Sequence, residues 1–367
     1  MKIFYAVQAT GNGHISRATE ILPYLQQHGT VDVFLSGNNF ALNTNLPVAY
    51  RSKGLSLKYD KNGGVDILGT ATSVNFKKIW NEARSLPIEK YDLVINDFES
   101  ITSLACKLKK IPSIHFGHQA SFKSKLTPRP KEKNILGEWV LRNYARGTST
   151  IGLHFKSYDK DIYPPIIKKS ILQATPSDAG HITVYLAHYA DEFLIREFQK
   201  LKKFKFELFS VTAKTPYTLE NVQVYPVTQI LFNKSLINCH GVITGAGFET
   251  PAEALYLRKK IIVVPMKKQY EQACNTAALN AFGVMSLNTI DEYFPAYFNK
   301  WIFDTRTCGL NLTHNTEQII NSVIHKHKEL NDTTEKEFDG FGMNFDLNYP
   351  ILQRELNTIQ GNGPLPG

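Results

Sequence analysis

The sequence predicts an α/β protein with two doubly wound domains, each holding a parallel sheet covered by helices on both faces. Short, continuously apolar runs alternate with segments whose apolar residues recur at helical spacing, as in sheets that are buried on both sides. The chain has 367 residues, which suits two domains at ~100–200 residues each. A proline-containing segment interrupts the alternation near the middle of the chain.

The first half of the chain shows the alternation clearly. Ile3–Val7 is an apolar run that stops at a turn, and from Ile15 onward apolar residues recur at helical spacing. Ser121–Lys133 breaks the rhythm with five Lys or Arg residues and two prolines, and it predicts a mobile basic loop. The other predicted elements are strands at Val31–Leu35, Tyr91–Asn96 and Ile111–Phe116, and helices at Ile101–Leu108 and Asn134–Ala145.

A junction is expected where Tyr163-Pro164-Pro165 and the turn-forming residues of Ala174–Gly180 stand. We therefore assign an N-terminal domain to residues 1–162, a C-terminal domain to 163–345 and a C-terminal segment to 346–367, with a disordered end. The alternation resumes with strands predicted at Ile182–Leu186, Phe206–Val211, Val222–Val227, Gly241–Thr244 and Ile261–Pro265, and helices at Glu192–Leu201, from about Thr250 and from about Tyr270.

Composition excludes several classes of protein. An aromatic content of 11% and only 17 prolines exclude a mainly disordered chain. The four cysteines lie far apart, which argues against a zinc ribbon, a thioredoxin-type motif or a disulfide scaffold and favours a reducing cytosol. No apolar run approaches the ~20 residues that span a bilayer, so we expect a soluble, cytoplasmic protein. The net charge of +9 suits an anionic partner, but no nucleic-acid-binding motif accompanies it.

The first candidate site is a glycine turn between the first strand and the first helix, Thr-Gly-Asn-Gly-His-Ile-Ser-Arg at residues 10–17. Gly11 and Gly13 allow close approach of a ligand, and the N–H groups of the following helix attract anions. In a doubly wound sheet ligands bind here, at the carboxyl ends of the strands. The turn lacks the dinucleotide pattern Gly-x-Gly-x-x-Gly, and His14 could simply cap the helix. Arg17 could contact a phosphate or only solvent.

The second candidate site repeats this arrangement at residues 244–255. Gly245 and Gly247 follow a predicted strand, and Thr250 stands at a predicted N-cap before Pro251. A phosphate could accept hydrogen bonds from the N–H groups there and from the Thr250 hydroxyl. Glu253, three residues after Thr250, could instead close a capping box with it.

The third candidate site follows the strand predicted at Ile261–Pro265. Glu271, Gln272 and Asn275 begin a helix there and could hydrogen-bond to sugar hydroxyls, or they could form an ordinary polar helix start.

Other polar residues carry weaker signals. His115 and His118 are three residues apart but have no third metal ligand nearby, so we interpret them as pocket or core histidines. Asp159-Lys160-Asp161 does not end a predicted core strand, and we interpret it as chance. Phe248 is expected to pack in the core. No metal site is predicted.

The order and spacing of the three motifs resemble those of nucleotide-sugar glycosyltransferases of the GT-B type, whose two Rossmann-like domains face a central cleft. The sequence is most similar to glycosyltransferase family 28, which includes the bacterial N-acetylglucosaminyltransferase of lipid II synthesis. Within it, Gly-x-Gly-His-x-x-Arg, Asn-Asp-Phe-Glu and Gly-Ala-Gly-Phe-Glu-Thr-Pro-x-Glu-Ala-Leu-Tyr-Leu resemble a bacterial and archaeal branch. The resemblance extends from residue 1 to about 290.

The resemblance implies a role for each matching residue. His14 matches the histidine that acts as general base or contacts donor and acceptor, and Asp97 matches the aspartate that orients it. Asn12 stands where a glycine is common, which leaves the fold and class intact. Thr250 replaces the usual serine and Glu271 the usual aspartate, and these two departures leave the sugar identity open. The implied donor-binding residues are Gly11, Gly13 and Arg17, the phosphate-binding Gly245, Gly247 and Thr250, the ribose-binding Glu253, and Glu271, Gln272 and Asn275 at the donor sugar.

The resemblance also implies an activity. We expect inverting, metal-independent transfer of a hexosyl group from a nucleotide sugar, UDP-linked, to an acceptor hydroxyl, without a cofactor. Synthesis of a cell-envelope glycan or glycolipid would fit. The alternatives are a nucleotide-sugar 2-epimerase of the same fold and a non-catalytic nucleotide-sugar-binding regulatory subunit, although the presence of both His14 and Asp97 argues against the latter.

A peripheral membrane contact is a further expectation for residues 122–145. In the lipid II transferase, a basic and apolar surface of the N-terminal domain faces the membrane. Here the basic residues of the loop precede the apolar residues Ile135, Leu136, Trp139 and Val140. The apolar face could instead pack on the sheet, with the loop as a lid over the acceptor site.

Overall fold

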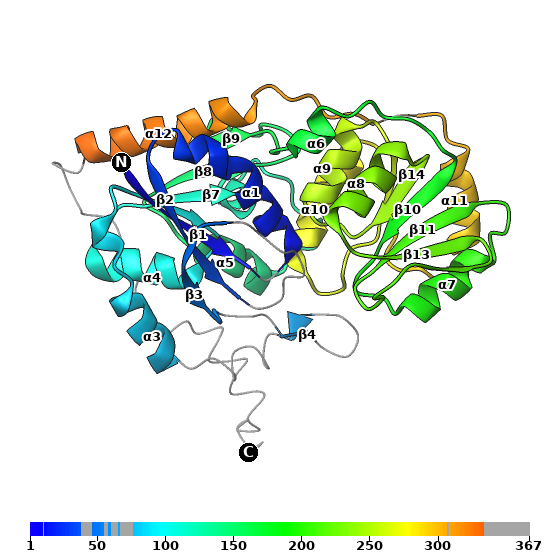
Figure 1. The fold of residues 1–367 in the computed structure, drawn as a ribbon, viewed down its shortest axis with the longest axis horizontal. Helices are drawn as coiled ribbons and strands as arrows, with labels where there is room; N and C mark the ends of the chain where they lie inside the picture. The colour runs from blue at the N-terminus through cyan, green and yellow to red at the C-terminus, as the bar shows by residue number, and fades with distance from the viewer. Residues whose placement is uncertain are drawn as a thin grey trace, which may run out of the picture. The chain divides into compact units, whose positions relative to one another are not determined.

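Two seven-stranded sheets form the frame of the protein. The computed structural model describes residues 1–9, 11–37, 46–54, 58–59, 65–66, 76–306 and 308–333. The first sheet has the order β3-β2-β1-β6-β7-β8-β9, and the second has the order β12-β13-β11-β10-β14-β15-β16. All neighbouring strands in them are parallel except β12 and β13. Helices lie beside the strands of both sheets (Figure 1).

The first sheet and its helices come from the first half of the chain, as predicted. Their bounds are β1 Lys2–Gln8, α1 Asn12–Gln26, β2 Thr30–Ser36, β3 Val48–Ser52, α3 Phe76–Ser85, η1 Ile88–Lys90, β6 Leu93–Asp97, α4 Ser100–Lys109, β7 Ile114–Gly117, η2 Gln119–Lys123, α5 Ile135–Asn143, β8 Ser149–Leu153 and β9 Ile162–Tyr163. A separate two-stranded sheet joins β4 Lys58–Tyr59 to β5 Val65–Asp66.

The second sheet and its helices follow the junction. Their bounds are α6 Lys169–Leu172, β10 His181–Tyr185, α7 Asp191–Gln199, β11 Lys205–Ser210, β12 Tyr217–Leu219, β13 Val222–Pro226, α8 Gln229–Asn238, β14 Gly241–Thr244, α9 Glu249–Tyr256, β15 Lys260–Val263, α10 Tyr270–Ala281, β16 Met285–Ser286, α11 Phe294–Ile302 and α12 Thr316–Thr333. All nine predicted strands are present; the edge strands β9, β12 and β16, of two or three residues each, carry no periodicity that predicts them.

The apolar runs of the sequence become buried central strands. Every residue of Ile3–Val7 in β1 is fully buried, because β1 lies between β2 and β6 and is covered on both faces. Ile15, Ala18, Ile21 and Leu25 of α1 belong to the same core as β1. The helical spacing of these residues thus marks the face of α1 that packs on the sheet.

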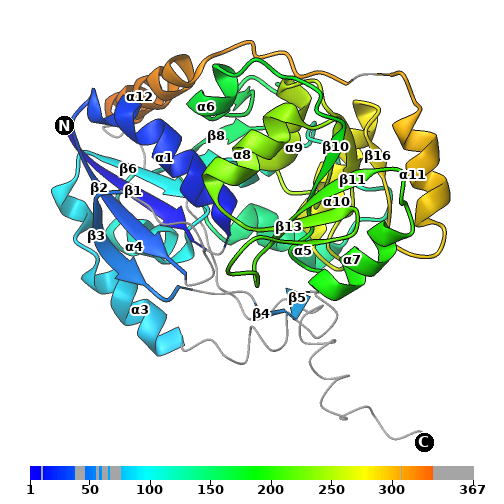
Figure 2. The same ribbon diagram turned by 45° about the vertical axis from the view of Figure 1, so that its right-hand side comes forward.

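The last described helix, α12, returns to the first sheet. Ile319, Ile320, Val323 and Ile324 join the core that contains β1, and α12 lies beside α1 in both views (Figures 1 and 2). Residues 1–330 form one compact unit. The predicted domain boundaries stay a prediction, and the C-terminal segment 346–367 lies outside the described residues.

The predicted loop over 121–133 is confirmed for residues 124–133, which form turns and bends, whereas residues 121–123 belong to a 3₁₀ helix. Its first residues belong to the 3₁₀ helix η2, in which Ser121 and Phe122 are buried. Arg129 donates to both carboxylate oxygens of Glu138, at 2.7 and 3.0 Å, and lies over the Phe122 ring. The stretch is therefore anchored by a buried aromatic ring and an ion pair. Over the described residues, no helix is long and apolar enough to cross a bilayer.

Candidate active site

The strand order places one glycine turn at the ligand-binding edge of each sheet. In the first sheet the strand order reverses between the parallel neighbours β1 and β6, and in the second between β10 and β14. Such switch points leave a crevice at the carboxyl ends of the strands. His14 follows β1, Asp97 ends β6, and Gly245 and Gly247 follow β14, so the predicted residues stand at these edges.

His14 and Asp97 form the pair that the resemblance implies. Nδ1 of His14 lies 2.8 Å from Oδ1 of Asp97, which is fully buried. An ionised carboxylate only accepts hydrogen bonds, so this contact places the proton on Nδ1 and leaves the lone pair on Nε2. Burial alone would raise the pKa of Asp97, but Arg17 and His14 hold it well below its ordinary value. The pair therefore presents a base at Nε2.

Arg17 joins this pair and extends it to the other sheet. Its Nη2 donates to Oδ1 and Oδ2 of Asp97 at 2.8 and 2.9 Å, and its Nε donates to Oδ2 at 3.1 Å. Its Nη1 donates to Glu249, the first residue of α9. Arg17 is buried, so the solvent-exposed alternative is wrong. The predicted phosphate contact stays a prediction, because two carboxylates hold the guanidinium here.

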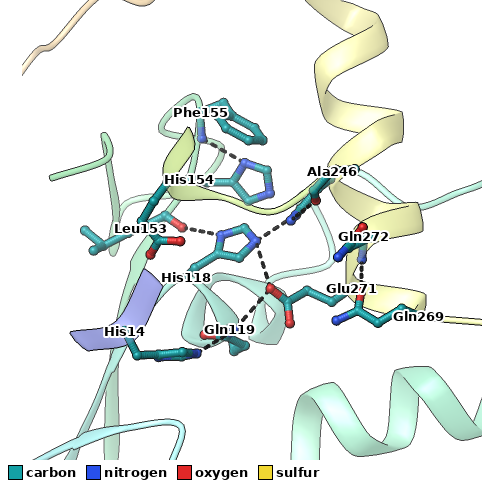
Figure 3. A network of polar contacts seen from close by, with 12 residues as sticks. His14, His118, Gln119, Leu153, His154, Phe155, Ala246, Gln269, Glu271 and Gln272 are labelled. Carbon is teal, nitrogen blue, oxygen red and sulfur yellow. Dashed lines mark hydrogen bonds and ion pairs between the residues drawn. The ribbon is translucent and has the colours of Figure 1, made fainter. Parts of the chain in front are cut away.

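Gln119 connects His14 to the donor-side residue Glu271 (Figure 3). Its Nε2 lies 3.4 Å from Nε2 of His14 and 3.1 Å from Oε1 of Glu271. The amide N–H can donate to the lone pair of His14, in agreement with the tautomer that Asp97 imposes. Glu271, which begins the first turn of α10, is thus brought opposite the catalytic pair.

Asn275 lies behind the site rather than in it. It is fully buried; its Oδ1 is 2.7 Å from Nε2 of His118, and its Nδ2 donates to the Ala246 carbonyl at 3.0 Å. His118 in turn places Nδ1 3.0 Å from the Leu153 carbonyl (Figure 3). Its ring also stacks on Phe248. Asn275 therefore holds the glycine turn after β14 against the first sheet. Its predicted contact with the donor stays untested.

The turn after β14 has room for a ligand beside its backbone. At Gly247 no atom lies within 4 Å of where a Cβ would stand, and at Gly245 the nearest is Oε1 of Gln272, at 3.7 Å. That oxygen accepts a hydrogen bond from the Met266 N–H at 2.8 Å, so Gln272 uses it to shape the loop before α10. Gln272 keeps its side-chain NH₂ group for other contacts.

The start of α9 differs from the prediction. The helix begins at Glu249 with Phe248 as its N-cap residue, and no side chain caps it. Thr250 is therefore the second helical residue rather than the N-cap. The capping-box alternative for Glu253 is wrong, because Glu253 instead accepts from Nζ of Lys168 at 3.0 Å. Burial raises the pKa of Glu253, and Lys168 opposes this effect. The ribose role of Glu253 stays a prediction.

The remaining histidines near the site are core residues. Burial lowers the pKa of His115 to about 4 and that of His154 well below its ordinary value. Nδ1 of His154 accepts from the Phe155 N–H at 2.9 Å, so the ring is neutral. Across the described part of the chain, no three or more His, Cys, Asp or Glu residues are grouped so that they could hold a metal ion.

A cavity of about 300 Å³ lies beside η2, away from these residues. Lys123, Ser124, Thr150, Asp159 and Asp161 are among its lining residues, and none of the predicted site residues is. The Arg17–Glu249 and Gln119–Glu271 contacts instead join the residues at the edges of the two sheets. The candidate site is therefore placed at these contacts and not at the cavity.

Residues 122–145 form a surface of mixed basic and apolar character. Its lysines are exposed, and so are Leu126 (66%), Ile135 (74%) and Trp139 (45%). In α5 only Leu141 is buried, so the alternative that the predicted apolar face packs on the sheet is wrong for Ile135 and Trp139. Arg129 is bound to Glu138 and does not belong to the exposed set. The exposed lysines are Lys123, Lys125, Lys131 and Lys133.

The sequence missed two residues of the site. Gln119 lies two residues after the end of β7, next to His118. This position at the carboxyl end of a strand could have indicated a site residue. Glu249 lies inside the second motif, but nothing local indicates a partner 232 residues away.

Comparison with known proteins agrees with this fold. The family described as Glycosyl transferase family 1 matches residues 1–300. A search of curated protein sequences found no match.

Among solved structures, the glycotransferase of kitacinnamycin is 14% identical, with a TM-score of 0.54 over 90% of this chain and 95% of that chain. The Streptomyces sp. SF2575 glycosyltransferase SsfS6 complexed with thymidine diphosphate is 13% identical, with a TM-score of 0.52 over 89% and 99%. Arabidopsis thaliana UGT89C1 complexed with UDP is 10% identical, with a TM-score of 0.52 over 89% and 94%. These likenesses show the GT-B fold, and the narrower resemblance to family 28 stays a prediction. The chain belongs to glycosyl transferase family 1 and is a glycosyltransferase.

Proposed function

We propose that the enzyme transfers a hexosyl group from a UDP-linked sugar to an acceptor hydroxyl with inversion at the anomeric carbon. The observation that supports this most directly is the orientation of His14. Its Nδ1 is 2.8 Å from Asp97, and its Nε2 is directed toward Gln119 and Glu271. His14 would then serve as the base for the acceptor, and Glu271, opposite it, would hold the donor sugar for a single displacement.

In this reaction the acceptor hydroxyl replaces Gln119 at Nε2 of His14. The hydroxyl proton passes to Nε2 as the oxygen forms its bond to the anomeric carbon, and the bond from that carbon to the phosphate oxygen breaks. The diphosphate leaves with the electron pair. Asp97 stabilises the imidazolium that forms, since its carboxylate already accepts from Nδ1. Direct displacement inverts the anomeric centre.

The donor diphosphate is proposed to bind at the N-terminus of α9. Its close approach needs an open backbone, which Gly247 supplies, and the free N–H groups of the first helical turn stabilise negative charge. The Thr250 hydroxyl adds one more donor. Glu271 and Gln272 bind the sugar, and Glu253 binds the ribose. Neither a metal ion nor a cofactor is proposed, so excess EDTA should leave the rate unchanged.

The acceptor is proposed to be membrane-associated, in a cell-envelope pathway of the kind that the family 28 resemblance implies. Lys123, Lys125, Lys131 and Lys133 surround exposed Leu126, Ile135 and Trp139, which is the combination expected of a protein that rests on an anionic membrane. The active site and this surface are joined by η2, which carries Gln119 at one end and Lys123 at the other. The protein would then work at the cytoplasmic face of the membrane.

Incubation with a panel of nucleotide sugars tests the proposal. UDP-glucose, UDP-galactose, UDP-N-acetylglucosamine and dTDP-glucose are each supplied, and released nucleotide and sugar products are separated by chromatography. Release of UDP from a UDP-sugar, with the freed or transferred sugar inverted at its anomeric carbon, is the expected result. Conversion to the 2-epimer without net release would show the epimerase alternative instead.

A further inference from the structure

Glu249 is the acidic residue of the site that the proposed reaction leaves without a role. It is the first residue of α9, on the donor side, yet its carboxylate accepts from Nη1 of Arg17 on α1. The carboxylate also lies over the start of α1, because a Cβ at Gly13 would overlap it. The first turn of α1 has no acidic residue of its own. Glu249 thus supplies, from the other sheet, the negative charge that a helix N-terminus favours.

The contacts run from Glu249 to the catalytic base without a break. Glu249 binds Arg17, and Arg17 binds both oxygens of Asp97. Asp97 lies 2.8 Å from Nδ1 of His14, and Nη2 of Arg17 lies 2.9 Å from the same nitrogen. The guanidinium therefore stands directly beside the imidazole. Its positive charge is shared between the carboxylates of Asp97 and Glu249.

We propose that Glu249 is a positioning residue of the transferase: it holds Arg17 against Asp97 and His14 and compensates the charge of Arg17. The proposal rests on the proposed role of His14 as base. It links the seat of the donor diphosphate, the α9 N-terminus, to the basicity of the catalytic histidine. When the N-terminus of α9 packs against α1, the Glu249 carboxylate lies beside the Arg17 guanidinium and compensates its charge next to His14.

The other charged and polar groups that face His14 are few among the described residues. Gln119 of η2 faces Nε2, with Glu271 of α10 behind it. His115 of β7 interacts electrostatically with His14, and the Tyr5 hydroxyl of β1 donates to Oδ2 of Asp97 at 3.3 Å. His115 is neutral, since burial lowers its pKa to about 4, and burial raises that of Tyr5 well above its ordinary value. Glu249 and Glu271 are therefore the other acidic residues near the His14–Asp97 pair.

The test is a titration of the His14 imidazole by ¹H–¹³C NMR, in the protein without added donor, for the wild type and Glu249→Gln. The glutamine keeps the size and can still accept from Arg17, but it removes the charge. The titration midpoint of His14 is expected to fall by ~0.5–1 pH unit, because Arg17, whose Nη2 lies 2.9 Å from Nδ1 of His14, then loses one of its two compensating carboxylates. Glu20→Gln, which removes a charge from the same helix α1, should leave the midpoint unchanged.

An unchanged midpoint in Glu249→Gln would overturn the proposal and reduce the Arg17–Glu249 contact to a structural ion pair. The measurement needs no turnover, so it stands apart from the proposed function. If the enzyme is active on a donor of the panel, the acid limb of the kcat/KM profile should move to lower pH by the same amount. A shifted midpoint without any transfer activity would contradict the proposed function while leaving the role of Glu249 intact.

Discussion

Nζ of Lys168 lies 3.0 Å from Oε2 of Glu253, and both residues are at least nine-tenths buried. Lys168 belongs to the segment that follows β9, and Glu253 belongs to α9 on the donor side. The pair thus ties the connection between the two sheets to the helix whose start is proposed to bind the diphosphate. Lys168 also donates to Oδ1 of Asn233 at 3.2 Å, so its ammonium keeps one partner if Glu253 is changed.

Glu253→Gln should lower the free energy of unfolding by ~1–3 kcal/mol, less than the ~3–5 kcal/mol typical of a broken buried pair, because glutamine still accepts from Lys168. Urea unfolding measures this loss. The double variant Lys168→Met/Glu253→Gln should cost less than the sum of the two single changes. UDP affinity, measured by calorimetry, should also fall in Glu253→Gln. If stability drops while UDP binds as before, Glu253 is structural and the ribose role is wrong.

His14→Ala should lower kcat by ~100-fold or more, as the loss of a general base does, while UDP binding stays at the wild-type level. Nucleotide release gives the rate and calorimetry gives the affinity. His28→Ala serves as control, since His28 lies in the turn after α1, far along the chain from the pair. Near-wild-type turnover in His14→Ala would remove His14 from the mechanism.

Asp97→Asn should destabilise the protein at neutral pH and flatten its response to acid. The pKa of Asp97 is depressed in the folded state, so the unfolded chain binds its proton more readily. Its stabilising contribution is therefore present above the ordinary carboxyl pKa of ~4 and is lost as pH falls toward the native value. Urea unfolding between neutral and acidic pH measures both effects.

The exposed Asp92, at the start of the same strand region, provides the matched control for Asp97. Asp92→Asn should leave kcat unchanged. Asp97→Asn should also lower kcat, but less than His14→Ala, because the base itself remains. An equally steep loss of stability with acid in Asp97→Asn and the wild type would show that Asp97 contributes nothing to it.

Gly13→Ala and Gly11→Ala form a matched pair within one glycine turn. A Cβ at Gly13 would overlap the Glu249 carboxylate, whereas at Gly11 no atom lies within 4 Å of a Cβ. Alanine is compatible with both backbones, since Gly13 is helical and Gly11 is extended at φ −156°. Gly13→Ala should displace Glu249 from Arg17 and lower kcat/KM by about tenfold or more, as small displacements at a catalytic site do. Gly11→Ala leaves the Glu249 carboxylate in place, so any loss there should appear as weaker UDP binding and not as a lower kcat. An equal fall of kcat in both variants would contradict a specific role for the Gly13–Glu249 approach.

Membrane contact is tested by co-sedimentation with vesicles of phosphatidylcholine, alone or mixed with phosphatidylglycerol. Binding should need the anionic lipid and weaken as salt rises, because each lysine near an anionic surface is worth ~1 kcal/mol. Changing Lys123, Lys125, Lys131 and Lys133 to Ser should abolish it. Arg129 is left unchanged, since it stabilises η2 through Phe122 and Glu138. No binding to either vesicle would point to an acceptor in solution.

The sequence predicted the alternating frame of the fold and both members of the His14–Asp97 pair. A continuous apolar run such as Ile3–Val7 predicts a central strand that is covered on both faces. The glycine turn that follows this strand then lies at the carboxyl edge of the sheet. His14 lies in the first turn of the helix after β1, and Asp97 ends β6, so the two residues meet because β1 and β6 are neighbours in the sheet.

The tertiary structure alone decided how the two halves meet. Arg17 and Glu249 are 232 residues apart, and Gln119 and Glu271 are 152 apart. The alternative of a capping box between Thr250 and Glu253 agreed with the local sequence, yet the Glu253 carboxylate accepts from Lys168, which lies in the connection between the sheets. Local periodicity reports which face of an element is buried, but a buried charge selects its partner by proximity in the folded chain, because leaving it unpaired costs several kcal/mol. The pair that forms is therefore the one that packing of the two sheets makes available.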